Sequence, residues 1–159
     1  MKYPLLLLLV VLAAGAWASP SEGRSAIEKE YAREADAASL HFARGMLSIR
    51  SADCQVFTPT GQRMNPDGDA DRLRLLFRNA LAVQEKVTIR SFHPTGPQAA
   101  TCLIDDRIEV TKMTARGPRT MAVQSQSQDD WAETPLGWRQ KAVHVLRQHV
   151  EILSTGQHR

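Results

Sequence analysis

Apolar residues recur at helical spacing in two stretches of the chain. A capping box at Ser25 and Glu28 predicts the start of a first helix, which Gly45 ends or bends. A second helix is predicted further along, with Asp67 or Asp69 as its N-cap. The apolar stripes consist of Ile27, Tyr31, Ala35, Ala38 and Phe42 in the first helix and Leu73, Leu76, Phe77, Ala80 and Leu81 in the second. Each stripe occupies one helix face, so we expect both helices to pack on that side.

From residue 85 onwards the apolar period changes to two, which is typical of strands. Four strands separated by turn signals extend to about residue 152, and residues 55–58 predict a short strand between the two helices. Helices followed by an antiparallel meander indicate an α+β domain.

Three turn signals give an expected register for the four strands. Turns centred on residues 95–96, 116–117 and 135–136 pair apolar with apolar positions, such as Val87 with Ile104. One sheet face then buries its side chains against the helices; they are Val87, Ile89, Cys102, Ile104, Ile108, Val110, Val123, Trp131 and Trp138. The opposite face, exposed to solvent or to another subunit, carries Arg107, Glu109, Gln124, Gln126, Gln128, Arg139 and Lys141.

A row of polar side chains crosses the middle of the apolar face. Asp106, Ser127 and His144 lie on three adjacent strands in this register, with Asp129 diagonal to His144. A carboxylate among apolar neighbours needs a partner or a wet cavity, and a buried His–Asp pair is a workable acid/base unit. We therefore take His144 as the candidate catalytic acid or base, Asp129 or Asp106 as the carboxylate that orients it, and Ser127 as a substrate-positioning residue.

Other interpretations of this row stay open. It can be a structural hydrogen-bond network, or a strand bulge can turn Asp106 outward. If residues 135–137 close as a three-residue loop with Gly137 left-handed, Gln128 rather than Ser127 neighbours His144.

Four further residues are candidate substrate contacts. Tyr31 projects from the first helix towards the sheet, where its phenol could polarise a carbonyl group. Trp131 and Trp138 could wall an apolar ligand, and His93 lies on the same face near its rim. Each also has a structural explanation, which is packing for the three aromatic residues and a solvated turn for His93.

The first eighteen residues have the three parts of a secretory signal peptide. Lys2 gives a positive start, residues 5–14 form an apolar run, and Ala16-Trp17-Ala18 provides the small-x-small cleavage pattern. The alternative is an N-terminal membrane anchor, but a bilayer span needs about 20 apolar residues. The predicted organisation is a signal peptide at 1–18, a polar lead-in at 19–24, the domain at 25–153 and a frayed tail at 154–159. We expect a secreted or periplasmic protein with no membrane segment after cleavage.

Composition narrows the classes of function. The 159-residue chain has a net charge of +3 and no basic run, which argues against a nucleic-acid binder. Two cysteines are too few for a disulfide scaffold or a four-ligand zinc site. The chain has no Cys-x-x-Cys, phosphate-binding glycine loop or Gly-x-Ser-x-Gly motif, so we expect no metal, no cofactor and no serine nucleophile.

Several short segments carry a family resemblance: Arg44-Gly45-Met46-Leu47-Ser48, Ser51-Ala52-Asp53, Val56-Phe57-Thr58-Pro59-Thr60-Gly61, Asp129-Asp130-Trp131, Gly137-Trp138-Arg139 and His144. In this order and spacing, residues 31–145 resemble the nuclear transport factor 2-like superfamily, in its SnoaL-like branch. The resemblance implies a cone-shaped, strongly curved antiparallel sheet around a long N-terminal helix plus a second helix, with an interior pocket. It also implies a homodimer through the outer sheet face.

The chain departs from the family pattern in two places. Pro135-Leu136 replaces a frequent Asp-Gly turn, and Cys54 stands where a second acidic residue is common. The strand order that the resemblance implies puts Cys54 three strands from Cys102, about 14 Å at the usual strand spacing. We therefore expect buried free thiols and not a disulfide.

Fold does not fix function in this superfamily, which includes enzymes and non-catalytic binding domains. One hypothesis is a cavity protein that binds a small apolar molecule and performs acid/base chemistry of the isomerase, lyase or hydrolase type. The other is a non-catalytic dimeric binding or assembly module. The sequence leaves open whether the protein is an enzyme.

Overall fold

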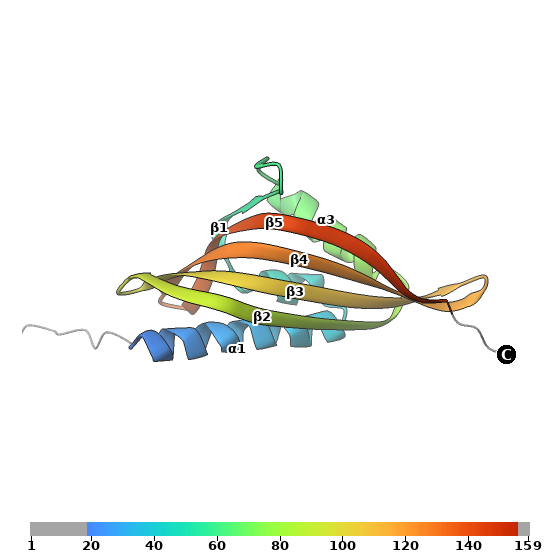
Figure 1. Cartoon of the computed structure of the whole chain (residues 1–159), viewed down its shortest axis with the longest axis horizontal. Coiled ribbons are helices and arrows are strands. Elements are labelled where there is room, and N and C mark those ends of the chain that lie inside the picture. Colours follow the sequence, from blue (N-terminus) through green and yellow to red (C-terminus); the bar gives the residue numbers. More distant parts are fainter. Residues whose placement is uncertain (1–18, 156–159) are drawn as a thin grey trace, which may run out of the picture.

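In the computed structural model, which describes residues 19–155, three helices lie on the hollow side of a curved five-stranded sheet (Figure 1). The sheet order is β1-β5-β4-β3-β2, and all neighbours are antiparallel except β1 and β5. This confirms the α+β class and the cone-like sheet. The elements are α1 (Pro20–Ser39), α2 (Ala43–Leu47), β1 (Arg50–Phe57), α3 (Pro66–Phe77), β2 (Ala80–Gly96), β3 (Ala99–Thr114), β4 (Gly117–Thr134) and β5 (Gly137–Thr155).

The predicted signal peptide lies outside the described residues, as does the end of the tail at 156–159. Within residues 19–155, no helix is both long enough and apolar enough to cross a membrane.

Both long helices begin earlier than predicted. Ser19 caps α1: its Oγ accepts from the Glu22 N–H at 3.3 Å, and its own N–H donates to the Glu22 carboxylate at 2.6 Å. The expected lead-in at 19–24 is therefore mostly helical. Asn65 caps α3 in the same way, with its Oδ1 accepting from the Asp67 N–H at 3.1 Å. In each case a proline follows the cap, and proline is favoured at the first helical position.

The first helix also ends before its predicted stripe does. The chain turns at His41, whose φ is +56°, and Phe42 is left 53% exposed instead of buried. Gly45 allows α2 to pack back closely, because a Cβ at this position would lie 2.4 Å from the Phe42 ring and 2.8 Å from Ala37. No other residue would fit without a shift of these neighbours.

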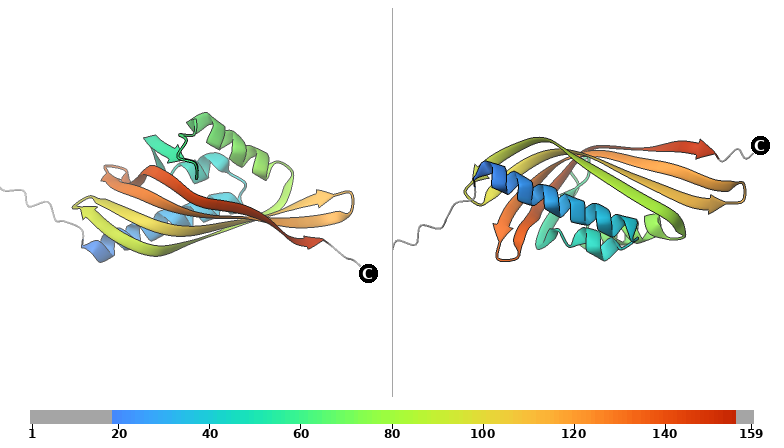
Figure 2. Two further views of the ribbon diagram at one scale, coloured as in Figure 1. Left: turned by 45° about the horizontal axis from the view of Figure 1, so that its top comes forward. Right: turned by 90° about the horizontal axis from the view of Figure 1, so that it is seen from below.

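The predicted apolar face of the sheet forms the core. α1 crosses the hollow side of the sheet (Figure 2) and buries Ile27 and Tyr31 against Cys102, Trp131 and Trp138. A second cluster joins Ala38, Met46 and Phe77 to Val83 and Val110. The remaining predicted positions on this face are buried or partly buried. Leu81, predicted in the apolar stripe of the second helix, lies instead in β2 and is 55% exposed, because α3 ends at Phe77.

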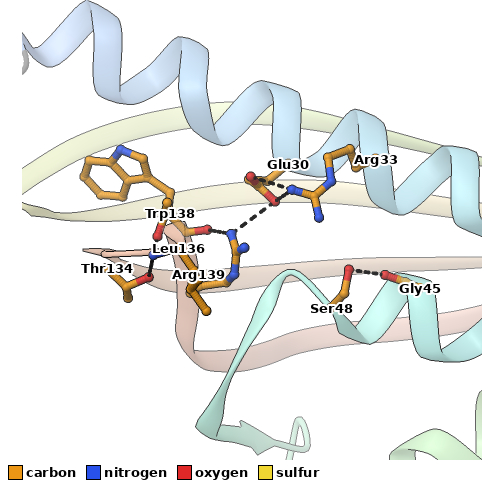
Figure 3. Close-up of polar contacts among 9 residues, drawn as sticks. Glu30, Arg33, Gly45, Ser48, Thr134, Leu136, Trp138 and Arg139 are labelled. Carbon is orange, nitrogen blue, oxygen red and sulfur yellow. Dashed lines mark hydrogen bonds and ion pairs between the residues drawn. The ribbon is translucent and has the colours of Figure 1, made fainter.

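An ion pair ties α1 to the β4–β5 hairpin (Figure 3). Arg139, predicted to lie on the outer face, reaches back so that its Nη1 lies 3.4 Å from Glu30 Oε2, while Arg33 donates to the same carboxylate at 2.8 Å. Arg139 also donates to the Trp138 carbonyl oxygen at 2.6 Å. Because the Glu30 and Arg139 side chains are mostly buried, this pair fixes the position of α1 over Trp138 better than an exposed pair would.

Two predicted turns are misplaced, but most residues of their strands keep the predicted faces. β2 and β3 join through Pro97-Gln98, and β3 and β4 through Ala115-Arg116, so the pairings shift by two residues along β3–β4 and along β2–β3 as far as Ile89. Ile104, for example, pairs with Ile89 instead of Val87. A shift of two leaves these side chains on their predicted faces, whereas beyond Ile89 a bulge at Arg90 adds one residue to the shift and reverses the faces of β2.

The third turn is at Pro135-Leu136 as predicted, and Trp131 pairs with Gln140. Beyond that pair, Lys141 is an extra residue in β5, because the next pair joins Asp130 to Ala142. This β-bulge shifts the register by one, and His144 consequently pairs with Gln128. The alternative register, in which Gln128 neighbours His144, is thus confirmed. Its cause is a β-bulge and not a three-residue loop.

Candidate functional site

A cavity of about 580 Å³ lies between α1, α3 and the hollow face of the sheet. One part of its lining is apolar and includes Leu73, Leu76, Met121, Val123 and Val150. The lining residues most open to solvent, such as Leu75 and Val150, come from α3 and the end of β5, so the cavity opens there. The other part is acidic: it contains Glu34, Glu85, Asp106 and Asp129.

Asp129 accepts more hydrogen bonds than any other of these four carboxyl groups. It is 1% exposed and accepts from Ser127 Oγ at 2.6 Å, from the Tyr31 hydroxyl at 2.7 Å and from Gln140 Nε2 at 2.8 Å. Burial raises the pKa of Asp129, and these three hydrogen bonds oppose that rise. Trp131 Nε1 in turn donates to the Tyr31 oxygen at 3.2 Å. The Tyr31 proton is committed to Asp129, and burial raises the pKa of Tyr31 well above its usual range.

The hydrogen bonding of Asp106 is much weaker than that of Asp129. It receives one long hydrogen bond, 3.5 Å from Ser125 Oγ, and its buried Oδ1 has no partner among the described residues. Burial raises the pKa of Asp106 to about 7, and the charge of Asp129 adds to this effect. A carboxyl group of this kind exchanges its proton near neutral pH.

Two more carboxyl groups face Asp106 from neighbouring elements. Glu85 pairs with Ile108 in the ladder, which makes Asp106 its diagonal neighbour, and burial raises the pKa of Glu85 to about 8. Its buried Oε2 also lacks a partner in the described part of the chain. Glu34 comes from α1, and burial together with the Glu85 charge raises its pKa well above the usual range.

Arg50 supplies positive charge to this end of the cavity. Its guanidinium donates to the Asp69 carboxylate of α3, which largely compensates its charge locally. Its buried Nε has no partner within residues 19–155. The acidic side chains therefore outnumber the cation that faces them, and protonation of some of them relieves the repulsion.

The structure brings four of the predicted site residues together. Tyr31, Asp106, Ser127 and Asp129 all line the cavity. Their roles differ from the predicted ones, because Ser127 and Tyr31 hold Asp129, whereas Asp106 is the carboxyl group left free.

His144 does not join them. The bulge at Lys141 turns its side chain to the outer face, where it stacks on Phe57 with ring centroids 4.7 Å apart. Its Nε2 lies 3.7 Å from the Asp130 carboxylate, and its side chain is 40% exposed. The predicted pairing of His144 with Asp129 or Asp106 is therefore wrong.

The remaining candidates are also outside the cavity lining. Trp131 and Trp138 are buried in the core cluster, so packing is the correct explanation for both. His93 is exposed because Arg90 forms another bulge, after which Phe92 takes the inward position. The sequence interpretation missed Glu34, Arg50, Glu85 and Gln140.

Cys54 and Cys102 are both buried and unbridged, as predicted. They lie on β1 and β3, which are separated by two strands. Burial raises the pKa of Cys54 to about 11 and that of Cys102 to about 12. Neither thiol is activated as a nucleophile.

The position of His144 leads to a prediction. His144→Ala should lower the free energy of unfolding by no more than about 1 kcal/mol, because it removes one exposed stacking contact and one long ion pair. Urea denaturation at pH 7 measures this. A loss above about 3 kcal/mol, the size expected for a buried ionic network, would contradict the placement of His144 on the outer face.

Comparison with known proteins agrees with this geometry. No protein-family model and no curated protein matches the sequence. The crystal structure of Kfla4162 from Kribbella flavida superposes with a TM-score of 0.65 at 19% identity, over 82% of this chain and 95% of that one. The type 2 hexachlorocyclohexane dehydrochlorinase LinA gives a TM-score of 0.62 at 13% identity, over 82% and 88% of the two chains.

A proposed dehydratase of the nuclear transport factor 2-like family from Streptomyces avermitilis also gives 0.62, at 15% identity, over 80% and 97% of the chains. The chain therefore has the nuclear transport factor 2-like fold.

Proposed function

We propose that this protein binds a small, largely apolar molecule in its cavity and moves a proton on it, in an isomerisation or an elimination. The observation that carries the proposal is Asp106. Its carboxyl group faces an apolar-walled cavity, its Oδ1 is unpartnered, and its pKa is about 7 because of burial. Such a group is ionised often enough to take a proton and basic enough to hold it.

The two neighbouring carboxyl groups suit opposite roles. At neutral pH Asp106 is the stronger candidate for the base, since the pKa of Glu85 is about 8 and Glu85 keeps its proton longer. Glu85 can then donate its proton to the atom that gains negative charge. Return of that proton to Glu85, while Asp106 delivers the abstracted proton to another carbon, completes an isomerisation. Asp129 with Tyr31 acts as a positioning pair that fixes the cavity wall. The names of two structural neighbours, a dehydrochlorinase and a proposed dehydratase, describe eliminations and support this reaction class.

Binding without turnover is the second candidate. The observation in its favour is that the Tyr31 hydroxyl donates to Asp129 and has no second proton to offer a ligand. Ligand binding without any proton transfer would favour this candidate.

A neutral fluorophore tests the cavity directly. Prodan should bind and shift its emission to shorter wavelength, and Val123→Trp should weaken binding at least tenfold because Val123 lines the cavity. Gln124→Trp is the matched control, since residue 124 is adjacent on the same strand but points to the opposite face. Equal binding by the two variants, with cooperative unfolding of both, would place the probe elsewhere and contradict the proposal.

We also propose that the protein is secreted or periplasmic and forms a homodimer through its polar outer face. Cleavage after Ala18 would make Ser19, the cap of α1, the first residue, with Glu22 beside its new ammonium group. N-terminal sequencing of the exported protein should begin at Ser19, and sedimentation should give twice the chain mass.

A further inference from the structure

The acidic part of the cavity has more unpartnered acceptors than donors: among the described residues three buried oxygen atoms there lack a partner, against one buried donor, Arg50 Nε. The buried Glu85 Oε2, Asp106 Oδ1 and Gln140 Oε1 have no partner among the described residues. Gln140 is an independent sign of an absent donor, because it is only 3% exposed, lines the cavity and cannot protonate its amide oxygen. Glu34 makes no side-chain hydrogen bond to residues 19–155. A ligand that fills this place must donate.

The charges favour a ligand that is also positive. Arg50 faces the acidic groups but is paired with Asp69, and Asp129 receives neutral donors only. Arg72 and Lys112 line the cavity nearer to solvent, and Lys112 donates to the Leu75 carbonyl oxygen. The titratable and charged groups that face the acidic end are Tyr31 and Glu34 of α1, Arg50 of β1, Asp69 of α3, Glu85 of β2, Asp106 of β3 and Asp129 of β4. The acidic end therefore carries surplus negative charge whenever its carboxyl groups ionise.

The rest of the lining sets the shape of the ligand. Beyond the acidic end, the walls are the apolar side chains of α3 and of the far halves of β4 and β5, among them Leu73, Leu76, Val123 and Val150. These residues offer no polar side-chain atom to a ligand. A ligand that suits both parts has a polar, donating head and an apolar body.

We propose that the cavity takes an organic cation: a protonated amine seated among Glu34, Glu85, Asp106 and Gln140, with its apolar body along α3 and β4. This inference rests on the proposed function, because it names the class of small molecule that the cavity binds. An ammonium group carries three N–H donors and a positive charge, which answers both the missing donors and the surplus acid.

Binding of such a cation should be linked to proton release. Asp106 and Glu85 are partly protonated at pH 7, because burial raises their pKa to about 7 and about 8. An ammonium group nearby favours their ionised forms, so these groups lose protons as it binds. The affinity for an amine should accordingly rise from pH 6 to pH 8, and that for a neutral alcohol should not.

Three probes of equal length separate the possibilities in isothermal titration calorimetry at pH 7. Octylamine should bind at least tenfold more tightly than octanol, octanoate should bind most weakly, and only octylamine should release a proton when buffers of different ionisation enthalpy are compared. The Glu85→Gln/Asp106→Asn double variant should lose the preference for the amine. Asp105→Asn is the matched control, since Asp105 points to the outer face, where it accepts from Arg90 and Gln126, and it should keep the preference.

The outcomes distinguish this inference from the function on which it rests. If octanol binds as tightly as octylamine and displaces prodan, the cavity binds apolar molecules but the amine inference is wrong. If neither probe binds and prodan does not bind either, the proposed function itself fails. An amine preference that the double variant retains would place the ammonium group elsewhere and would also overturn the inference.

Discussion

Replacing Asp106 by asparagine should slow proton abstraction in the cavity by about 100-fold, the lower end of the range for a general base. A suitable reporter is 5-nitrobenzisoxazole, from which a base removes a carbon-bound proton while the ring N–O bond breaks to give a coloured phenolate. The wild-type rate should rise with pH through about 7 as Asp106 ionises, because burial places its pKa there. Absorbance of the product measures the rate.

Asp105→Asn provides the control for this experiment. Residues 105 and 106 are consecutive on β3, and Asp105 lies on the outer face. The Asp105→Asn variant should therefore keep the wild-type rate and its pH profile. Equal rates for wild type and Asp106→Asn would show that Asp106 is not the base.

Raising the pH from 5 to 8 should destabilise the folded protein by on the order of 6 kcal/mol, about 3 kcal/mol for each of Asp106 and Glu85. Burial raises the pKa of Asp106 from 3.8 to about 7 and that of Glu85 from 4.5 to about 8. Groups with raised folded-state pKa values contribute stability that is complete below their unfolded values and is lost as the pH passes the folded ones. Urea denaturation at each pH measures the free energy of unfolding.

The pH window separates these groups from the exposed acids. Asp53 has a pKa lowered to about 2 by its hydrogen bond from Lys141, and a hydrogen bond from Arg90 lowers the pKa of Asp105. The stability that these two groups contribute is therefore constant between pH 5 and 8 and is lost only below about pH 4. The Glu85→Gln/Asp106→Asn double variant should be more stable than wild type at pH 8 and should depend less on pH between 5 and 8, with the remaining dependence due to Glu34, whose pKa burial also raises. Stability that rises with pH in wild type would show that these carboxyl groups are ionised throughout.

The hollow face of the sheet could be predicted because side chains alternate between the two faces of a strand. A turn misplaced so that the pairing shifts by two residues therefore leaves the same side chains on the hollow face. Two turns were placed wrongly, yet Cys102, Ile104 and Ile108 still face inward. An error of one residue has the opposite effect, and β-bulges cause such errors. The bulges at Arg90 and Lys141 moved His93 and His144 out of the predicted site. No residue pattern in β2 or β5 marks them.

The same reasoning from apolar periodicity could have found two of the missed site residues, Glu85 and Glu34. Alternation through Val83 and Val87 places Glu85 on the hollow face, and Glu34 follows Tyr31 by three residues on α1. Both are charged residues at apolar positions. Arg50 could not have been found in this way, because it stands at the start of β1 without a periodic context, and only the packing of α3 brings Asp69 to it.

Titration of the side-chain carboxyl carbons by NMR, with Asp106 assigned through the Asp106→Asn variant, tests the central claim most directly. Asp106 should titrate near pH 7, well above the exposed Asp53, because its carboxyl group is buried at the cavity wall with one weak hydrogen bond. A midpoint below pH 5 would show that Asp106 is an ordinary ionised carboxylate, and the cavity would then hold no group ready to exchange a proton at neutral pH.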